Sequence, residues 1–263
     1  MTSQTGEDMD EKRQRLKDEF TAARGYWSPI WDDILEATPE YFEAYMNFSS
    51  VPWKTGTLDP KVRELIYIAI DSSTTHMYEP GLKVHIRNAL KYGATKQEIM
   101  EVYQLTSVLG IHTVTTGLPV LLDEMAKAGR AVPEAARPLT PHQEQLKKTF
   151  TENRGYWSPL WDGLIRISPE FFEAYMNFSS VPWQTGTLDP KVRELIYIAI
   201  DSATTHLYEP GLRVHIQNAL KYGATLQEIM EVYQLTSVLG VHTVTFGMPA
   251  LIDELERAEK GEK

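Results

Sequence analysis

The 263-residue chain contains no cysteine. This absence excludes disulfides, thiolate nucleophiles, zinc–thiolate sites and dithiol redox chemistry. Basic residues are also scarce relative to acidic ones, because 26 Lys and Arg stand against 36 Asp and Glu and give a net charge of −10. Nucleic acids and anionic membrane surfaces both attract basic protein surfaces, so we expect neither as a partner.

Long apolar runs are missing as well. The longest is LIYIAI at residues 65–70, which falls far short of the ~20 residues that cross a bilayer. We interpret it as the buried face of a core helix. The first twenty residues have no apolar centre and do not resemble a secretory signal. We therefore expect a cytoplasmic protein with no membrane partner.

What the sequence does contain is an internal repeat. Residues 24–128 align without a gap to residues 154–258, with roughly four fifths of the positions identical. This repeat is far longer than the ~20–50 residues of a solenoid unit, so we interpret it as two copies of a small domain. The predicted boundaries are residues 1–130 for the first copy and 142–263 for the second. A linker rich in proline and small residues occupies 131–141.

Apolar residues inside each copy follow helical spacing, and no segment shows strand alternation. An Asp–Pro pair predicts a helix over 60–75, and Pro80 ends it and begins a second helix. Thr95 and Glu98 have the spacing of a capping box that starts a third. We expect an all-α fold in which the two copies form a pseudo-twofold pair, as a fused homodimer would.

Side chains that can move protons or bind metal recur at matching positions in both copies. Each copy has three histidines and two glutamates of this kind. They are Glu64, His76, Glu79, His85 and His112, and Glu194, His206, Glu209, His215 and His242. Because the two copies are so similar in sequence, the recurrence of these residues does not by itself show that they have a function. The turn at Pro80, however, is expected to fold the helices that carry Glu64 and His85 back on each other.

Each candidate also has a purely structural explanation. His76 is expected at a helix C-terminus and Glu79 at a helix N-terminus, where the helix dipole favours their charges. Glu64 could be a buried carboxylate that pairs with Arg63, and His85 a hydrogen-bonded core histidine.

The aromatic stretch RGYWSPIWDD, which starts at Arg24 and recurs in similar form from Arg154, is expected to serve packing. Trp53, which lies in a predicted turn, is a better candidate for a pocket wall. The sequence contains no glycine-rich phosphate loop, zinc-protease helix or G-x-S-x-G elbow.

The run TLDPKVRELIYIAI … VHIRNALKYGATKQEIMEVYQLTSVLG resembles the carboxymuconolactone decarboxylase family. That family's pattern is an REL helix followed by H…AL..GAT..EI.EV. The resemblance covers Thr57–Gly110 and its counterpart in the second copy. It implies an all-helical fold whose single-domain members form dimers that build trimers or hexamers. A tandem chain would then be a homo-oligomer, a trimer of fused chains that forms a pseudo-hexamer.

The same superfamily includes alkylhydroperoxidase D-like proteins, which reduce peroxide with a glutamate, a C-x-x-C dithiol and a histidine. The resemblance places that glutamate at Glu64 and the histidine at His85, with the cysteine positions at about His76 and Glu79. No thiol is present in either copy, so a thiol peroxidase is excluded. His112 departs from the usual decarboxylase pattern, in which a glycine-aromatic-proline segment is commoner.

The resemblance and the His/Glu set together predict an enzyme of the lyase type. We expect acid–base decarboxylation, or related lyase or isomerase chemistry, on a small carboxylated or lactone compound in aromatic compound catabolism. His85 would be the general acid, Glu64 would orient its ring, and His76 or His112 would bind the substrate carboxylate. No cofactor is required in this interpretation.

Two alternatives remain open at this stage. Three imidazoles and a carboxylate per copy could bind Zn²⁺, Fe²⁺ or Mn²⁺, although Pro80 works against regular helical geometry between His76 and Glu79. The chain could also be a non-catalytic ligand-binding oligomer. The differences Thr116/Phe246 and Lys54/Gln184 between the copies indicate that their pockets need not be equivalent.

Overall fold

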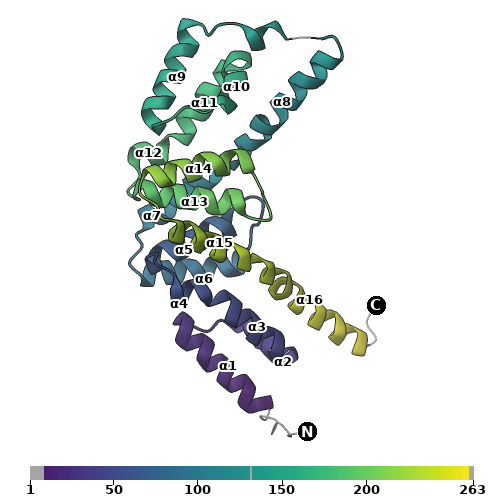
Figure 1. Ribbon diagram of the computed structural model, residues 1–263. Helices are drawn as coiled ribbons and strands as arrows, with labels where there is room; N and C mark the ends of the chain where they lie inside the picture. The colour runs from purple at the N-terminus through teal and green to yellow at the C-terminus, as the bar shows by residue number, and fades with distance from the viewer. Residues whose placement is uncertain (1–8, 131, 261–263) are drawn as a thin grey trace, which may run out of the picture. The chain divides into compact units, whose positions relative to one another are not determined.

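The computed structural model describes residues 9–130 and 132–260, and all regular elements in these ranges are helices (Figure 1). The all-α prediction is confirmed. The first copy contains α1 (Met9–Arg24), α2 (Asp32–Ala37), α3 (Pro39–Ser49), α4 (Val51–Thr55), α5 (Pro60–Ser72), α6 (Glu79–Lys91), α7 (Lys96–Ser107) and α8 (His112–Lys127). The second contains α9 (Pro141–Arg154), α10 (Asp162–Ile167), α11 (Pro169–Ser179), α12 (Val181–Thr185), α13 (Pro190–Ser202), α14 (Glu209–Lys221), α15 (Leu226–Ser237) and α16 (His242–Glu259).

Local sequence signals account for several helix ends. The predicted capping box is present at the start of α7, where the Glu98 amide donates to Thr95 Oγ1 at 3.1 Å and the Thr95 amide donates to Glu98 Oε2 at 2.7 Å. The helix expected over 60–75 ends earlier, at Ser72. It ends there because the Tyr78 amide donates back to the carbonyl of Asp71, which reverses the chain before α6.

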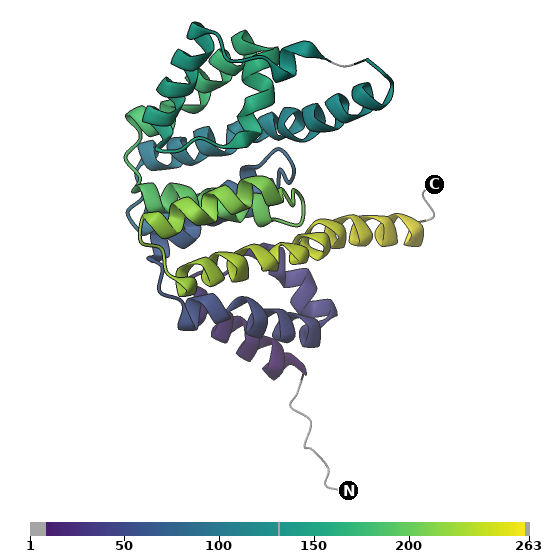
Figure 2. The same ribbon diagram turned by 45° about the horizontal axis from the view of Figure 1, so that its top comes forward.

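The chain divides into two compact units, Met1–Arg63 with Thr225–Lys263, and Glu64–Ala224. Each unit contains helices from both sequence copies. In the first unit, α15 packs against α4 and α16 against α2. In the second unit, α7 packs against α12 and α13, and α8 against α10 (Figure 2). The last two helices of each copy therefore complete the helical core of the other copy. We call this arrangement the helix exchange.

Each unit has an aromatic core that the exchange completes. In the first unit, Phe20 and Phe42 are fully buried, and Val241 of the second copy joins their cluster. In the second unit, Phe150 and Phe172 occupy the equivalent places, and Ile111 of the first copy joins them. Burial of such a side chain contributes roughly 1.5–3 kcal/mol to folding, so the exchanged helices are part of the core rather than a covering layer.

A buried glutamate in each exchanged helix holds the loop before the next core helix. In the second unit, the Glu101 carboxylate accepts hydrogen bonds from the amides of Thr187 (2.6 Å) and Leu188 (3.0 Å) and pairs with Arg193 Nε at 2.6 Å. A Cβ at Gly186 would lie 2.2 Å from Glu101 Oε1. Glycine is therefore required there. We call this arrangement the Glu101 clamp.

The Glu231 clamp in the first unit has the same contacts. Glu231 accepts from the amides of Thr57 (2.6 Å) and Leu58 (2.9 Å) and pairs with Arg63 Nε at 2.6 Å. Arg63 therefore pairs with Glu231, and not with its neighbour Glu64 as the structural explanation of Glu64 supposed.

Two continuous helical stretches, Lys96–Lys127 and Leu226–Glu259, are long and apolar enough to cross a membrane by length and composition. A third of the window that meets this test is buried in each stretch, and their first helices pack in the helix exchange. Core helices pass the same test, so this is weak evidence for a membrane span. The absence of a membrane partner stays a prediction.

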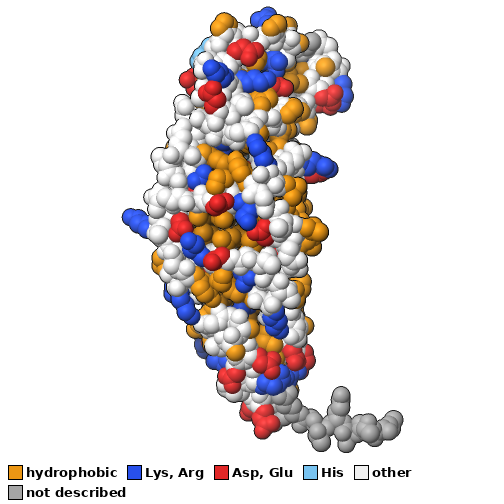
Figure 3. All heavy atoms as spheres, turned by 60° about the vertical axis from the view of Figure 1, so that its left-hand side comes forward, with side chains coloured by type: hydrophobic (Ala, Val, Ile, Leu, Met, Phe, Trp, Pro, Cys, Tyr) orange, Lys and Arg blue, Asp and Glu red, His pale blue; other side chains and the backbone are white. Residues whose placement is uncertain are grey.

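Apolar side chains reach the surface among charged ones on the face that Figure 3 displays. Exposed large hydrophobic residues occur in both units, for example Phe48 at 53% and Phe178 at 56% exposure. Exposed apolar side chains are what subunit contacts cover in an oligomer. The predicted homo-oligomer remains a prediction.

Candidate functional site

Two equivalent groups of acid–base side chains lie within Glu64–Ala224, one on α5 and α6 and the other on α13 and α14. The latter two helices lie side by side (Figure 1). Each group takes a glutamate and an aspartate from its first helix, a histidine from the turn, and a histidine from its second helix. The first set is Glu64, Asp71, His76 and His85, and the second set is Glu194, Asp201, His206 and His215.

In the second set, a glutamate holds the ring of His215. His215 Nδ1 lies 2.6 Å from Glu194 Oε2, while Asn218 donates to Glu194 Oε1 at 3.3 Å. Tyr197 stacks on the His215 ring with centroids 4.3 Å apart. An ionised carboxylate can only accept hydrogen bonds, so Nδ1 carries the proton in this bond. Nε2 is then the nitrogen free for chemistry.

The first set repeats this geometry. His85 Nδ1 lies 2.6 Å from Glu64 Oε2, Asn88 donates to Glu64 Oε1 at 3.2 Å, and Tyr67 stacks on His85 at 4.3 Å. The expected approach of Glu64 to His85 across the turn is therefore present.

A buried aspartate stands at the centre of the second set, although sequence reasoning did not select it. Asp201 Oδ2 lies 3.9 Å from His215 Nε2, and Oδ1 lies 4.0 Å from His206 Nε2 and 3.9 Å from His112 Nδ1. Neither Asp201 oxygen has a hydrogen-bond partner among the described residues. Burial raises the pKa of Asp201 to about 7; the charge of His215 opposes the rise and that of Glu194 adds to it.

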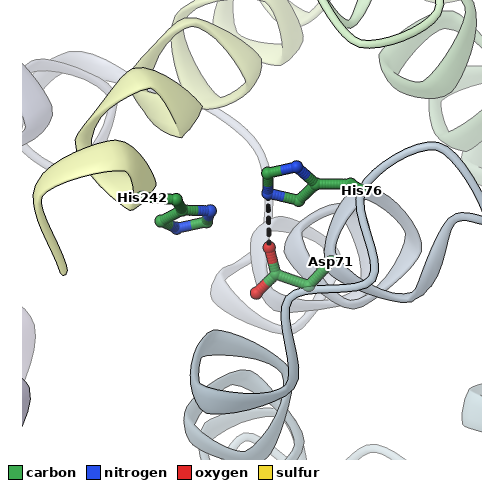
Figure 4. A group of neighbouring side chains, drawn as sticks. All are labelled: Asp71, His76 and His242. Carbon is green, nitrogen blue, oxygen red and sulfur yellow. Dashed lines mark ion pairs between the residues drawn. The ribbon is translucent and has the colours of Figure 1, made fainter. Parts of the chain in front are cut away.

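Asp71 occupies the same place in the first set. Its Oδ1 faces His76 Nε2 at 3.8 Å (Figure 4), and its Oδ2 lies 4.0 Å from His85 Nε2. Burial raises the pKa of Asp71 to about 7 as well. A signal was present in the sequence, because Glu64 and Asp71 are seven residues apart and so share one face of the helix.

The turn that carries His206 is tightly shaped. Leu207 has φ 49°, a left-handed conformation that is uncommon for a residue with a Cβ. At the start of α14, a Cβ on Gly211 would lie 2.3 Å from Asp201 Oδ2. The turn and the glycine thus let the Asp201 carboxyl approach the backbone of α14 closely. Met77 has the equivalent conformation in the first copy, with φ 53°.

His112 joins the second set. The sequence predicts it beside the histidines of its own copy, but the helix exchange carries α8 to the other copy. His112 Nδ1 lies 2.7 Å from His206 Nε2, and its ring stacks on Tyr208 with centroids 3.7 Å apart. Thr115, one helical turn further along α8, bonds the Tyr208 hydroxyl at 2.5 Å.

The two remaining predicted glutamates lie at the surface. The side chains of Glu79 and Glu209 are 72% and 69% exposed and form ion pairs with Lys83 and Arg213, four residues further along their helices. Both glutamates lie at a helix N-terminus, where the helix dipole favours a negative charge, and this explains their presence. His242 begins α16 in the first unit and is partly buried.

Two of the histidines around Asp201, His112 and His206, are uncharged at neutral pH. Burial lowers the pKa of His112 to about 3, with a further lowering from His206 and His215. Burial also lowers the pKa of His206, and of His76 in the first set. A neutral imidazole offers a carboxylate a hydrogen bond but no opposite charge. The expected binding of a carboxylate by His76 or His112 would therefore lack an electrostatic attraction.

Two neighbouring cavities adjoin the second set. An inner chamber of about 40 Å³ is lined by residues that include Arg154, Tyr156, Tyr175, Tyr197 and His215. An outer chamber of about 970 Å³ reaches His206 and Thr116. The two share the side chains His112, Thr115, Leu160 and Tyr208.

The aromatic stretch that begins at Arg154, which was expected to serve packing, therefore forms part of a cavity wall. Trp53, which was expected to line a pocket, instead stacks against Arg24 (5.1 Å) and Arg63 (5.2 Å) in the first unit.

Three side chains of this site could hold a cation. His112 Nδ1, His206 Nε2 and an Asp201 carboxyl oxygen all lie within 4.8 Å of one another. Two imidazoles and a carboxylate are ligands that Zn²⁺ and similar metals accept.

Comparison with known proteins supports the resemblance drawn from the sequence. The model of the carboxymuconolactone decarboxylase family matches residues 39–119 and 169–253. Among solved structures, the chain is similar to "a putative gamma-carboxymuconolactone decarboxylase subunit" from Burkholderia xenovorans LB400. The two are 45% identical, with a TM-score of 0.89, over 94% of this chain and 98% of that one. No curated protein matches the chain.

Proposed function

Because the chain belongs to the carboxymuconolactone decarboxylase family, we propose that it is a decarboxylase-like enzyme that acts on a small carboxylated or lactone compound by acid–base chemistry. One observation carries the proposal. In the second set, an imidazole fixed by a carboxylate at 2.6 Å faces a second, buried carboxyl whose pKa is about 7. A group that titrates near the working pH suits general acid–base catalysis.

In the proposed reaction, the bond between the substrate carbon and its carboxylate breaks, and CO₂ leaves. The electron pair of that bond moves into the lactone system as an enolate. His215 in its doubly protonated form then donates the Nε2 proton to carbon, while the Glu194 carboxylate keeps the ring oriented and stabilises its positive charge.

Asp201 would return the proton to His215. Its carboxyl lies 3.9 Å from Nε2, which is too far for a direct hydrogen bond but within reach through one water. His85, Glu64 and Asp71 would play the same roles in the first set, so we propose that both copies are active.

The sharpest test replaces both proton donors. We expect the double variant His85→Gln, His215→Gln to lose CO₂ release from carboxymuconolactone, by about 100-fold or more in kcat. His142→Gln is the matched control, because His142 is 60% exposed and lies in neither set. If the double variant keeps its turnover, the assigned role of these histidines is wrong. A non-catalytic ligand-binding oligomer would show no turnover in the parent protein either.

The remaining features of the proposal follow from the family resemblance and the composition. We propose a cofactor-free reaction with a small-molecule substrate, in a cytoplasmic homo-oligomer, a trimer of tandem chains that forms a pseudo-hexamer. Exposed apolar side chains such as Phe178 support the oligomer. A role in aromatic compound catabolism is part of the same proposal.

A metal-dependent enzyme is a second candidate, favoured by the cluster of His112, Asp201 and His206. A metal bound there would act as a Lewis acid on a carbonyl oxygen. Metal analysis of the purified protein separates the two candidates. A stoichiometric transition metal whose removal by chelation abolishes activity supports the second, and full activity in metal-free protein contradicts it.

A further inference from the structure

Arg154, the last residue of α9, is a buried cation without an anionic partner. It is only 5% exposed, and its guanidinium stacks on Phe150 (5.7 Å) and Trp183 (5.1 Å). Its Nε has no hydrogen-bond partner, and no carboxylate among the described residues forms an ion pair with it. Arg193, by contrast, pairs with Glu101 at 2.6 Å. A buried charge of this kind is unfavourable unless an opposite charge joins it.

Three tyrosines surround this cation. The charge of Arg154 acts on the hydroxyls of Tyr156, Tyr175 and Tyr197. Burial raises the pKa of all three, that of Tyr175 to about 12, so the hydroxyls stay protonated and can donate hydrogen bonds. A guanidinium with phenol donors beside it is suited to bind a carboxylate.

The two chambers differ in size, so each can hold a different part of a ligand. The inner chamber of about 40 Å³ holds only a few atoms, because one water-sized sphere takes about 10–15 Å³ on this measure. A carboxylate fits this space and a lactone ring does not. The outer chamber of about 970 Å³ lies in the range of small-molecule pockets. A ligand would thus place a small group inside and its body outside.

We propose that Arg154 anchors a carboxylate of the ligand in the inner chamber, beside the Tyr197 and His215 rings. This inference rests on the proposed function, since it assigns a binding role within the same site. Arg154 supplies the positive charge that the neutral His112 and His206 lack.

The anchored carboxylate is a group that the reaction retains. A cation that held the departing carboxylate would stabilise the ground state more than the transition state, in which that charge moves to the enolate. The ligand of this site therefore has an anchoring carboxylate in addition to the group that it loses.

The test uses a saturated probe that cannot react. Binding of 5-oxotetrahydrofuran-2-acetate and of its neutral methyl ester is measured by calorimetry on the full chain. We expect the acid to bind roughly 10- to 100-fold more tightly than the ester. Arg154→Gln should remove one equivalent of acid sites without affecting the ester. Arg257→Gln, on the exposed part of α16, is the matched control and should change neither.

Because the probe is unreactive, the result does not depend on turnover. Equal binding of acid and ester by the parent protein overturns the anchor, and so does an unchanged number of acid sites in Arg154→Gln. If that variant does not fold, Arg154→Lys, which keeps the charge, must retain a preference for the acid. If Arg154 anchors the acid but the double histidine variant stays active, the proposed reaction is contradicted and the anchor is not.

Discussion

The first and second sets have nearly the same internal geometry. The glutamate-to-histidine distance is 2.6 Å in both, and both central aspartates have pKa values raised to about 7 by burial. The separation of aspartate oxygen and turn histidine is 3.8 Å in the first set and 4.0 Å in the second. The duplicated helices have therefore kept the same arrangement of acid–base side chains.

The copies differ at positions around the sets. Ser73 Oγ lies 3.2 Å from Thr75 Oγ1 in the first copy, and the equivalent Ala203 has no hydroxyl. Thr116 lines the outer chamber, whereas its counterpart in the alignment is Phe246. Under the proposed function, both sets would catalyse one reaction with two ligand preferences, and the following experiments test that equivalence.

The largest expected effect concerns the clamps. Glu101→Ala leaves Arg193 buried without its partner and frees two loop amides, which should reduce the free energy of unfolding by roughly 3–5 kcal/mol. Glu231→Ala should have an equal effect, because its contacts with Arg63 and the loop amides are the same. Denaturant unfolding of the two variants measures this. A loss of less than about 1 kcal/mol in one of them would show that the copies are not equivalent.

The next effect concerns the buried aspartates and depends on pH. The Asp201 carboxyl loses its proton at about pH 7 in the folded chain, but near its ordinary value of 3.8 when unfolded. The folded state therefore binds the proton more tightly, and stability falls as pH rises from 3.8 to 7, by about 1.4 kcal/mol per pH unit. The total approaches roughly 4 kcal/mol above pH 7.

Asp201→Asn removes this loss, so the variant should be more stable than the parent at pH 8, with a smaller difference at pH 5. Unfolding curves at both pH values check the sign, and Asp71→Asn should behave alike. A stability gain that increases on acidification would mean that Asp201 is held as an anion.

A third experiment isolates the positioning glutamate of one set. In the His85→Gln background, only the second set can work, and Glu194→Gln removes the negative charge that stabilises a protonated His215 ring, while its amide oxygen can still accept from Nδ1. We expect kcat to fall by about 100-fold or more, with little change in KM. Glu209→Gln, which changes an exposed carboxylate at the start of α14, is the control and should leave kcat unchanged. Glu64→Gln in the His215→Gln background completes the comparison.

The smallest effect concerns the outer chamber. Thr116→Phe gives the second set's opening the residue that stands at the matching position of the other copy. The phenylalanine ring is larger than the threonine side chain and should raise KM by about fivefold, or ~1 kcal/mol, and leave kcat unchanged. Steady-state kinetics in the His85→Gln background measure it. An unchanged KM would show that this position does not contribute to the difference between the sites.

Local structure could be predicted from the sequence because its signals lie within a few residues of one another. The Thr95 capping box and the reversal before α6 are examples, and both are present. The helix exchange could not be predicted in the same way. Two copies that are mostly identical have the same apolar faces, so Ile111 and Val241 fit either core and the sequence does not say which core each enters.

In the candidate site, too, contacts between neighbouring helices could be predicted and contacts made by the helix exchange could not. Glu64 and His85 could be placed together because one turn separates their helices. The position of His112 depends on the exchange, which no local pattern reveals. The sequence does not single out Asp201, because a carboxylate near the end of an apolar helix is typical of a helix boundary. It does not single out Arg154 either, because the neighbouring aromatic residues indicate packing.

Because the helix exchange occurs within one chain, it does not depend on protein concentration. Since the two copies are parts of one chain, α7 and α8 meet their partner helices in a unimolecular step, at an effective concentration that the connecting segment sets. His112 therefore reaches Asp201 with a probability that does not depend on how much protein the cell contains. Two separate chains with the same contacts would dissociate at low concentration and lose this histidine from the site. The fused chain keeps its second set complete even as a single molecule.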